Sequence, residues 1–102
     1  RRAQRARLYI FLYNQGMKYF VYILECCDKT LYVGSTTDLE KRLHAHNNLK
    51  SGAHYTKIRR PVNLKYSQWF KTYAKSRSRE AELKRLTREE KLKIIKDYNV
   101  VK

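Results

Sequence analysis

Four side chains that can bind an anion or transfer a proton follow one another closely in the first half of the chain. Tyr22 and Tyr32 occupy two hydrophobic runs, and Arg42 and His46 come soon after the second run. A guanidinium is permanently charged and can bind two oxygens of an anion, whereas phenol and imidazole groups can exchange protons. Residues four apart lie one turn from each other on a helix, so Arg42 and His46 would share its flank. These types and spacings indicate a site for acid–base chemistry on an anion.

The two runs that carry the tyrosines are predicted to form a β-hairpin. Residues 19–26 and 31–34 are rich in β-branched and aromatic side chains, and residues 28–30 (DKT) supply turn chemistry between them. Strand alternation gives the first run two apolar faces, so we expect it to be a central strand. Gly34 ends the second run, at a place where the backbone must approach a neighbour closely or adopt a conformation that favours glycine.

A helix is predicted directly after the hairpin. Thr37 and Glu40 fit a capping box, with Thr37 as N-cap, that starts a helix running to about residue 47 or 48. Leu39 and Leu43 would form its buried stripe. Residues 48–61 then have the composition of a loop with a basic end.

A third strand and two more helices complete the predicted order. Apolar residues keep a period of two over residues 62–70, and Ser76 or Ser78 would cap a helix over residues 77–86. Thr87 and Glu90 fit a second capping box, which opens the final helix. The inward positions are expected to be Val62, Leu64, Tyr66 and Phe70 in the strand, with Trp69 on its opposite face, Leu83 and Leu86 in the first of these helices, and Leu92, Ile95 and Tyr98 in the last.

The order β-β-α-β-α-α predicts an α+β fold, with a small three-stranded sheet flanked by helices. A chain of 102 residues has room for one modest core, so a single domain is expected. Residues 1–16 are arginine-rich and differ in composition from the rest of the chain, and we interpret them as an N-terminal extension outside a functional domain of residues 17–102.

The charge balance points to a polyanionic partner. The chain has 24 Lys and Arg against 9 Asp and Glu, a net charge of +15. From Lys41 to Arg79 there are eleven basic residues and no acidic one. Such a strip favours nucleic acid, held through its phosphates, over the alternative of a solvated surface with an ordinary basic bias.

The cysteines indicate a reducing, cytoplasmic setting. Cys26 and Cys27 are adjacent, which is poor geometry for a bridge within a strand. A zinc site built from them with His44, His46 or His54 is set aside, because no Cys-x₂-Cys spacing is present. The apolar runs are too short to span a membrane, and nothing calls for an obligate protein partner.

Two triplets, FVY at residues 20–22 and YVG at residues 32–34, open an ordered series of short motifs. The series continues with GSTTDLEKRLHAHN (34–47), GAHYT (52–56), RRPV (59–62), and a last segment from SRSRE (76–80) to KL (91–92). As a whole it resembles the GIY-YIG nuclease family, and most of all its small single-domain bacterial branch (YhbQ-like). The resemblance covers nearly all of residues 17–98 and implies endonuclease activity. The departure is in the first triplet, where FV replaces GI and an extra ring would narrow the cleft.

The resemblance implies roles for the residues already singled out. Tyr22 and Tyr32 would line the active centre, and Gly34 would let the backbone turn beside them. Arg42 would hold the scissile phosphate, and His46 matches a position near the nucleophile in several nucleases of this family.

The resemblance also implies one divalent metal ion, Mg²⁺ or Mn²⁺, with Glu80 as its ligand. A carboxylate is the hard oxygen donor that Mg²⁺ prefers, and water and phosphate oxygens would complete the octahedron. Helical phase alone does not distinguish Glu80 from Glu82, because each lies beside an apolar residue of the predicted helix. Only the match to the family selects Glu80.

The general base is open between the tyrosines and the histidine. A phenol with a reference pKa near 10 is a poor base unless nearby positive charge stabilises its phenolate, whereas His46 needs no such shift. We favour Tyr22, activated by Arg42 and the metal and assisted or held by His46, with Tyr32 positioning groups.

The first functional hypothesis is therefore a metal-dependent endonuclease acting on DNA, with branched, nicked or single-stranded forms as candidate substrates. The second is a non-catalytic nucleic-acid-binding module of the same fold, and the third is a small basic protein that associates with RNA or the ribosome. DNA is favoured over RNA. The residues expected to position the nucleic-acid backbone are Lys57, Arg59, Arg60, Lys71, Lys75, Arg77 and Arg79.

Overall fold

The computed structural model describes residues 17–101, and its first two strands form the predicted hairpin. Strands β1 (Tyr19–Glu25) and β2 (Leu31–Thr36) pair antiparallel. In the turn, Asp28 Oδ1 accepts hydrogen bonds from both the backbone N–H and the hydroxyl of Thr30, and Lys29 takes a φ of 71°. Residues 1–16, interpreted above as an extension, lie outside the described residues.

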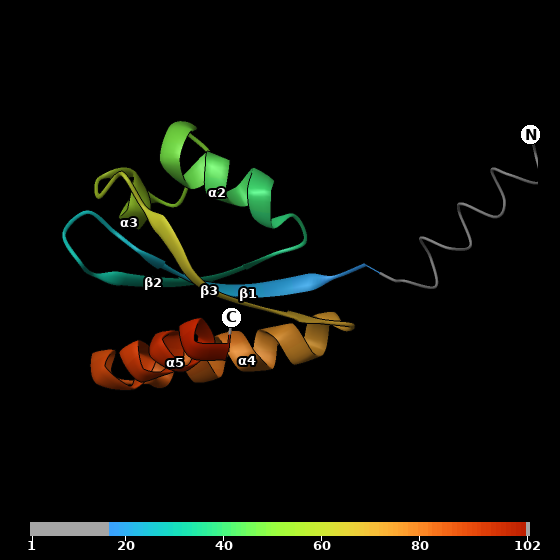
Figure 1. Cartoon of the computed structure of the whole chain (residues 1–102). Coiled ribbons are helices and arrows are strands. Elements are labelled where there is room, and N and C mark those ends of the chain that lie inside the picture. Colours follow the sequence, from blue (N-terminus) through green and yellow to red (C-terminus); the bar gives the residue numbers. More distant parts are fainter. Residues whose placement is uncertain (1–16, 102) are drawn as a thin grey trace, which may run out of the picture.

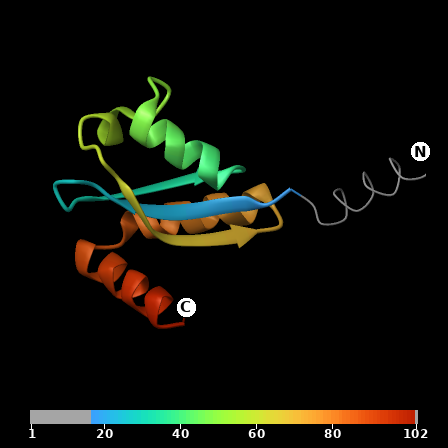
Figure 2. The same cartoon turned by 45° about the horizontal axis from the view of Figure 1, so that its top comes forward.

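The sheet is antiparallel, with strand order β2-β1-β3, and β3 comprises Asn63–Phe70. Helices α2 (Leu39–Asn48) and α3 (His54–Lys57) cover one face, and α4 (Tyr73–Arg85) and α5 (Arg88–Val101) cover the other (Figure 1). Figure 2 shows α4 running beneath the sheet, with α5 extending away at an angle. The predicted α+β fold is confirmed, and the short helix α3 is an addition within the segment expected to be a loop.

The central strand β1 is buried on both faces, as its two apolar faces predicted. On the α4 and α5 side, Val21 and Ile23 pack with Leu83 of α4. On the α2 side, Tyr22 and Leu24 belong to a second apolar cluster. Each face of β1 therefore has its own small core, and the polar groups of the site lie in the core on the α2 side.

A β-bulge in β3 changes which of its residues point inward. Ile23 pairs with Tyr66, but Leu24 pairs with Leu64, so Lys65 is an extra residue. An extra residue reverses the alternation of side chains along the strand. The predicted single inward face is therefore wrong: Val62 packs with Leu24 on the α2 side, Tyr66 packs on the α4 side, and Leu64 is 36% exposed.

Two helix starts differ from the sequence prediction. Helix α2 is capped by Asp38 and not Thr37, since the Asp38 side chain accepts from the Lys41 N–H. Helix α4 begins a full turn earlier than expected, and Thr72, whose side chain accepts from the Lys75 N–H, replaces the serines as its cap. In both cases several hydroxyl or carboxylate side chains compete for one cap, and the extended backbone of Asp38 and Thr72 selects them.

The final helix starts as predicted but turns a slightly different face inward. Thr87 and Glu90 form the expected reciprocal capping box. Ile95 is buried and Tyr98 packs on the core, whereas Leu92, expected to be inward, is 37% exposed. The helix contacts the sheet along one edge, which leaves the Leu92 position at the boundary with solvent.

Two leucines provide a paired test of this packing. Leu83 is fully buried in the core below the sheet. Leu83→Ala should therefore lower the free energy of unfolding by about 2–5 kcal/mol, because it removes buried methyl groups and leaves a cavity. Leu92→Ala should cost about 1 kcal/mol or less. Urea denaturation of both variants measures the difference, and equal losses would contradict the assigned face of α5.

Candidate active site

The Tyr22 side chain lies against the backbone of β2 in the core under α2. Tyr22 is buried, and its partner across the strand pair is Gly34. A Cβ atom built on Gly34 would lie 2.5 Å from the Tyr22 hydroxyl oxygen, which is closer than any real contact. Glycine is therefore required here for space, and the close approach expected at Gly34 is the approach of a phenol ring.

The Tyr22 hydroxyl is held by a buried chain of hydrogen bonds through His46. His46 Nε2 lies 2.7 Å from the Tyr22 hydroxyl, and His46 Nδ1 lies 2.7 Å from Thr56 Oγ1. The Thr56 hydroxyl donates its one hydrogen to the Ala53 carbonyl at 2.9 Å, so toward His46 it accepts. The imidazole hydrogen then sits on Nδ1, and Nε2 accepts from Tyr22.

Burial and charge keep both members of this pair neutral. Burial raises the pKa of Tyr22 to about 12, Arg42 opposes the rise through hydrogen bonding and charge, and Tyr32 and Glu80 add to it. Burial, and then the positive charges of Arg42 and Arg60, lower the pKa of His46 to about 4. At neutral pH a phenol therefore donates to a neutral imidazole, and Arg42 is the group that stabilises the phenolate.

The lowered pKa of His46 predicts a pH dependence of stability. The unfolded chain binds a proton at His46 below about pH 6.5, whereas the folded chain resists it until about pH 4. Stability should therefore fall as pH falls through this window, by up to about 1.4 kcal/mol per pH unit. Urea unfolding from pH 7.5 to 4.5 measures the slope. His46→Gln should flatten this slope, whatever the substitution does to stability at pH 7. An unchanged slope in the variant would contradict the assignment of the pH dependence to His46.

Tyr32 packs beside the imidazole rather than bonding to the Tyr22 hydroxyl. Its ring meets His46 edge-on, with 5.2 Å between centroids, and stacks on Tyr55 of α3 at 6.0 Å. The Arg59 guanidinium covers Tyr55, 3.8 Å from its ring centroid. This column of rings packs against the His46 ring, and the positioning role of Tyr32 in the reaction stays a prediction.

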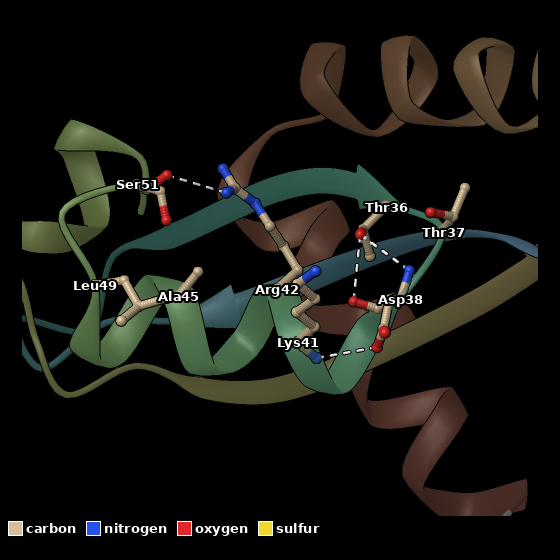
Figure 3. A pocket seen from close by; sticks show the side chains of 8 residues that line it. All are labelled: Thr36, Thr37, Asp38, Lys41, Arg42, Ala45, Leu49 and Ser51. Atoms are coloured by element: carbon tan, nitrogen blue, oxygen red, sulfur yellow. Dashed lines mark hydrogen bonds between the residues drawn. The ribbon is translucent and has the colours of Figure 1, made fainter.

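Arg42 lines an open hollow of about 390 Å³, and neither Tyr22, Tyr32, His46 nor Glu80 is among the residues that line it. Its guanidinium extends from α2 to donate to the Ser51 carbonyl at 3.1 Å, and Thr36 and Thr37 lie at the other end of the hollow (Figure 3). The acidic side chain in this lining, Asp38, is engaged in capping α2. The hollow therefore presents positive charge to an incoming anion. Its lining residues are Thr36, Thr37, Asp38, Lys41, Arg42, Ala45, Leu49 and Ser51.

Glu80 reaches the same edge strand from the opposite face of the sheet. It is 6% exposed, and its Oε1 accepts from the Ser35 hydroxyl at 3.0 Å. Ser35 directly follows Gly34 in β2, so this strand contacts the phenol on one side and the carboxylate on the other. The charge of Glu80 is the smallest of the causes that raise the pKa of Tyr22, after burial and Tyr32. Glu82, in contrast, points to solvent and pairs with Arg79.

Two cations also hold the Glu80 carboxylate. Arg77 Nη1 lies 3.1 Å from Oε1, and Lys84 Nζ lies 3.0 Å from Oε2. Both cationic side chains are 57% exposed, so they can move away at little cost. Within residues 17–101 no group of three or more His, Cys, Asp and Glu side chains could hold a metal ion. An ion at Glu80 would therefore take most of its ligands from water and substrate.

The three basic residues expected at the loop before β3 are bonded within the fold. Arg60 donates to the carbonyls of Ala45, His46 and Leu49, and so satisfies the C-terminal end of α2. Arg59 pairs with Asp28 and donates to the Tyr55 carbonyl. Lys57 donates to the carbonyl of Lys50. The donors of these three residues thus hold the backbone around α2 and α3 in place, and their positive charges add to the electrostatic potential there.

The basic residues expected on the other side of the sheet fall into two groups. Lys71 and Lys75 are exposed at the start of α4. Arg77 pairs with Glu80, and Arg79 pairs with Glu82 while also reaching the Tyr66 hydroxyl at 3.4 Å. Lys71 and Lys75 therefore keep their side chains toward solvent, and Arg77 lies next to the candidate metal ligand.

Three contributors to the site were not singled out from the sequence. Thr56 sets the tautomer of His46, Ser35 orients Glu80, and Tyr55 supports Tyr32. The GAHYT motif contains two of them, but nothing in its pattern says which side chain faces the imidazole. Ser35 carries no signal, because its role depends on an element 45 residues away.

A phenol, an imidazole and a guanidinium on one side of an edge strand, with a carboxylate on its far side, are groups that can bind an anion and transfer a proton. The model of the GIY-YIG catalytic domain matches residues 18–93 of the chain. The chain therefore belongs to the GIY-YIG family, and within it to the branch of the UPF0213 proteins. Among residues 17–101, no helix is long and apolar enough to cross a membrane.

The similarity to UPF0213 relatives extends over most of the length of each relative. A UPF0213 protein of Syntrophus aciditrophicus is 52% identical over 79 residues, which are 78% of this chain and 91% of the relative. UPF0213 protein SSP2268 of Staphylococcus saprophyticus is 48% identical over 80 residues, covering 78% and 96%.

Two solution NMR structures share the fold at 36% sequence identity. The UPF0213 protein BH0048 from Bacillus halodurans superposes with a TM-score of 0.52, covering 78% of this chain and 84% of that one. The protein EF2693 from E. faecalis superposes with a TM-score of 0.58, covering 81% and 88%.

Proposed function

We propose that the protein is a metal-dependent endonuclease that hydrolyses phosphodiester bonds in DNA. The observation that carries the proposal is the buried Tyr22–His46–Thr56 chain of hydrogen bonds, whose phenol and imidazole both lie within reach of the charge of Arg42, a residue that lines an open hollow. Burying the Tyr22 hydroxyl costs free energy, and the hydroxyl has room only because position 34 is a glycine. A phenylalanine would pack here without that cost, which supports a chemical use of the hydroxyl. The free thiols Cys26 and Cys27 favour work in the reducing cytoplasm.

In this proposal Tyr22 relays a proton from the attacking water to His46. As the phenol oxygen takes a proton from water, its own proton passes along the existing hydrogen bond to Nε2. Such a coupled transfer avoids a free phenolate, which a pKa of about 12 disfavours. A phosphate bound at Arg42 would offset the positive charge that depresses the pKa of His46, so substrate binding would make the imidazole a better acceptor.

Arg42 is proposed to bind non-bridging oxygens of the scissile phosphate and to stabilise the charge that develops on them. It would exchange the Ser51 carbonyl for phosphate oxygens at small cost, because the hollow in front of it is open. Tyr32 keeps the His46 ring in position through its edge contact.

The residues present fit a single Mg²⁺ or Mn²⁺ ion held through one carboxylate. Glu80 provides a hard oxygen ligand, and Ser35 orients it toward the edge of β2. When bound, such an ion supplies Lewis-acid stabilisation of the phosphate and leaving oxygens. In the free protein Arg77 and Lys84 neutralise the carboxylate, so they would compete with the ion.

Removing either the guanidinium or the carboxylate should abolish most cleavage. We expect Arg42→Ala and Glu80→Ala each to lower the rate of Mg²⁺-dependent nicking of supercoiled plasmid by roughly 10²-fold or more. Arg88→Ala, which removes an exposed arginine that donates to the Lys29 carbonyl and belongs to none of the expected site residues, is the matched control and should retain activity. If both site variants cut like the parent protein, the proposed centre is wrong.

Competition between Lys84 and the metal ion predicts a gain in metal affinity. Lys84→Met should tighten Mn²⁺ binding to the free protein by about two- to fivefold, because it removes an ammonium 3.0 Å from Glu80 Oε2. Titration followed by electron paramagnetic resonance measures this without any cleavage. Arg79→Met breaks the comparable pair with Glu82 and should leave the affinity unchanged. Weaker binding in Lys84→Met would show that the metal lies elsewhere.

The same fold acting only as a nucleic-acid-binding module is the second candidate. It is favoured by the complete engagement of Glu80, both of whose oxygens are occupied by side chains of this protein. Tight binding of DNA in Mg²⁺ with no nicking at any enzyme concentration would support it. Competition between RNA and DNA at stated salt concentrations decides which nucleic acid is preferred.

A further inference from the structure

A second hollow of about 260 Å³ adjoins the Arg42 hollow and is lined by aromatic and hydroxyl side chains. It lies between the start of β1, the end of β2 and the first turns of α4. The Tyr73 side chain stands at this hollow and is 60% exposed, a large value for an aromatic residue. Its lining residues are Tyr19, Ser35, Thr36, Thr37, Tyr73 and Ser76.

The aromatic wall of this hollow is braced from within the protein. Tyr19 meets Tyr73 edge-on, with 5.9 Å between ring centroids and 66° between planes. The Arg77 guanidinium carbon lies 5.9 Å from the Tyr73 centroid, so positive charge is present beside the ring. An exposed ring with a cation beside it is the combination that binds nucleobases by stacking.

The position of the hollow ties it to the proposed centre. Thr36 and Thr37 line both hollows, so the two hollows are neighbours at the end of β2. Ser35 lines the second hollow and also donates to Glu80. A strand whose phosphate is bound at Arg42 would pass over Thr36 and Thr37 and bring a neighbouring base to Tyr73.

We propose that this hollow is a subsite for one unpaired nucleobase of the DNA strand, stacked on Tyr73, next to the bond that is cut. The inference rests on the proposed function and specifies its substrate class. In duplex DNA both faces of a base are covered by its neighbours, so the base must leave the stack to reach the ring. The site therefore selects DNA that is single-stranded or locally unpaired beside the scissile phosphate.

Binding without cleavage tests the subsite directly. In EDTA and at fixed salt, fluorescence anisotropy compares a short labelled single strand with its duplex. Tyr73→Ala should weaken single-strand binding about tenfold and duplex binding much less, while Tyr73→Phe, which keeps the ring, should bind like the parent protein. The matched control is Trp69→Ala, since Trp69 is an exposed aromatic with Lys18 over its ring but does not line the hollow.

An abasic strand distinguishes stacking on a base from a general contact. Replacing one nucleotide at a time with an abasic sugar should reveal one position at which the parent protein loses about tenfold in affinity and Tyr73→Ala loses nothing further. Equal losses for Tyr73→Ala and Trp69→Ala, or equal losses on single strand and duplex, would overturn the subsite. If the base-dependent binding is found but the parent protein never cuts, the endonuclease proposal fails and the subsite stands.

Discussion

The structure of the site depends on the contact between the Tyr22 ring and the backbone of β2 at Gly34. No side chain fits between them, and this allows the hydroxyl to reach His46 across the core. His46 is fully buried, so its two ring nitrogens must both find partners, and the Thr56 hydroxyl completes the set. One missing methyl group thus decides whether the hydrogen-bonded chain can form.

The edge position of β2 lets a small protein assemble a site from both faces of its sheet. Tyr32 and Gly34 belong to the face under α2, while Ser35 points to the face under α4 and bonds to Glu80. In a central strand the two faces would be separated by neighbouring strands, as they are at β1. At the edge strand β2, only the width of one strand lies between the groups on the two faces and solvent.

The basic residues of the chain have two different roles in the folded protein. Arg60 and Arg59 use directional hydrogen bonds to fasten the end of α2 and the column of rings, whereas Lys71 and Lys75 stay exposed. All of them contribute to the long-range potential, which depends on net charge and not on which donors are occupied. Contacts with phosphate groups are therefore made by side chains whose donors are exposed, or whose present hydrogen-bond partners are weak enough to be exchanged.

Local rules in the sequence determined the elements, and the tertiary structure decided how their side chains meet. The alternation of two apolar faces predicted a central β1, and Thr87 with Glu90 predicted the start of α5, because these signals act between neighbouring residues. The caps of α2 and α4 and the bulge at Lys65 escaped prediction, because similar residues compete locally and long-range pairing selects among them. The tautomer of His46, the partners of Glu80 and the hollow at Tyr73 arise between elements far apart in the chain, where no periodicity in the sequence records which atoms will touch.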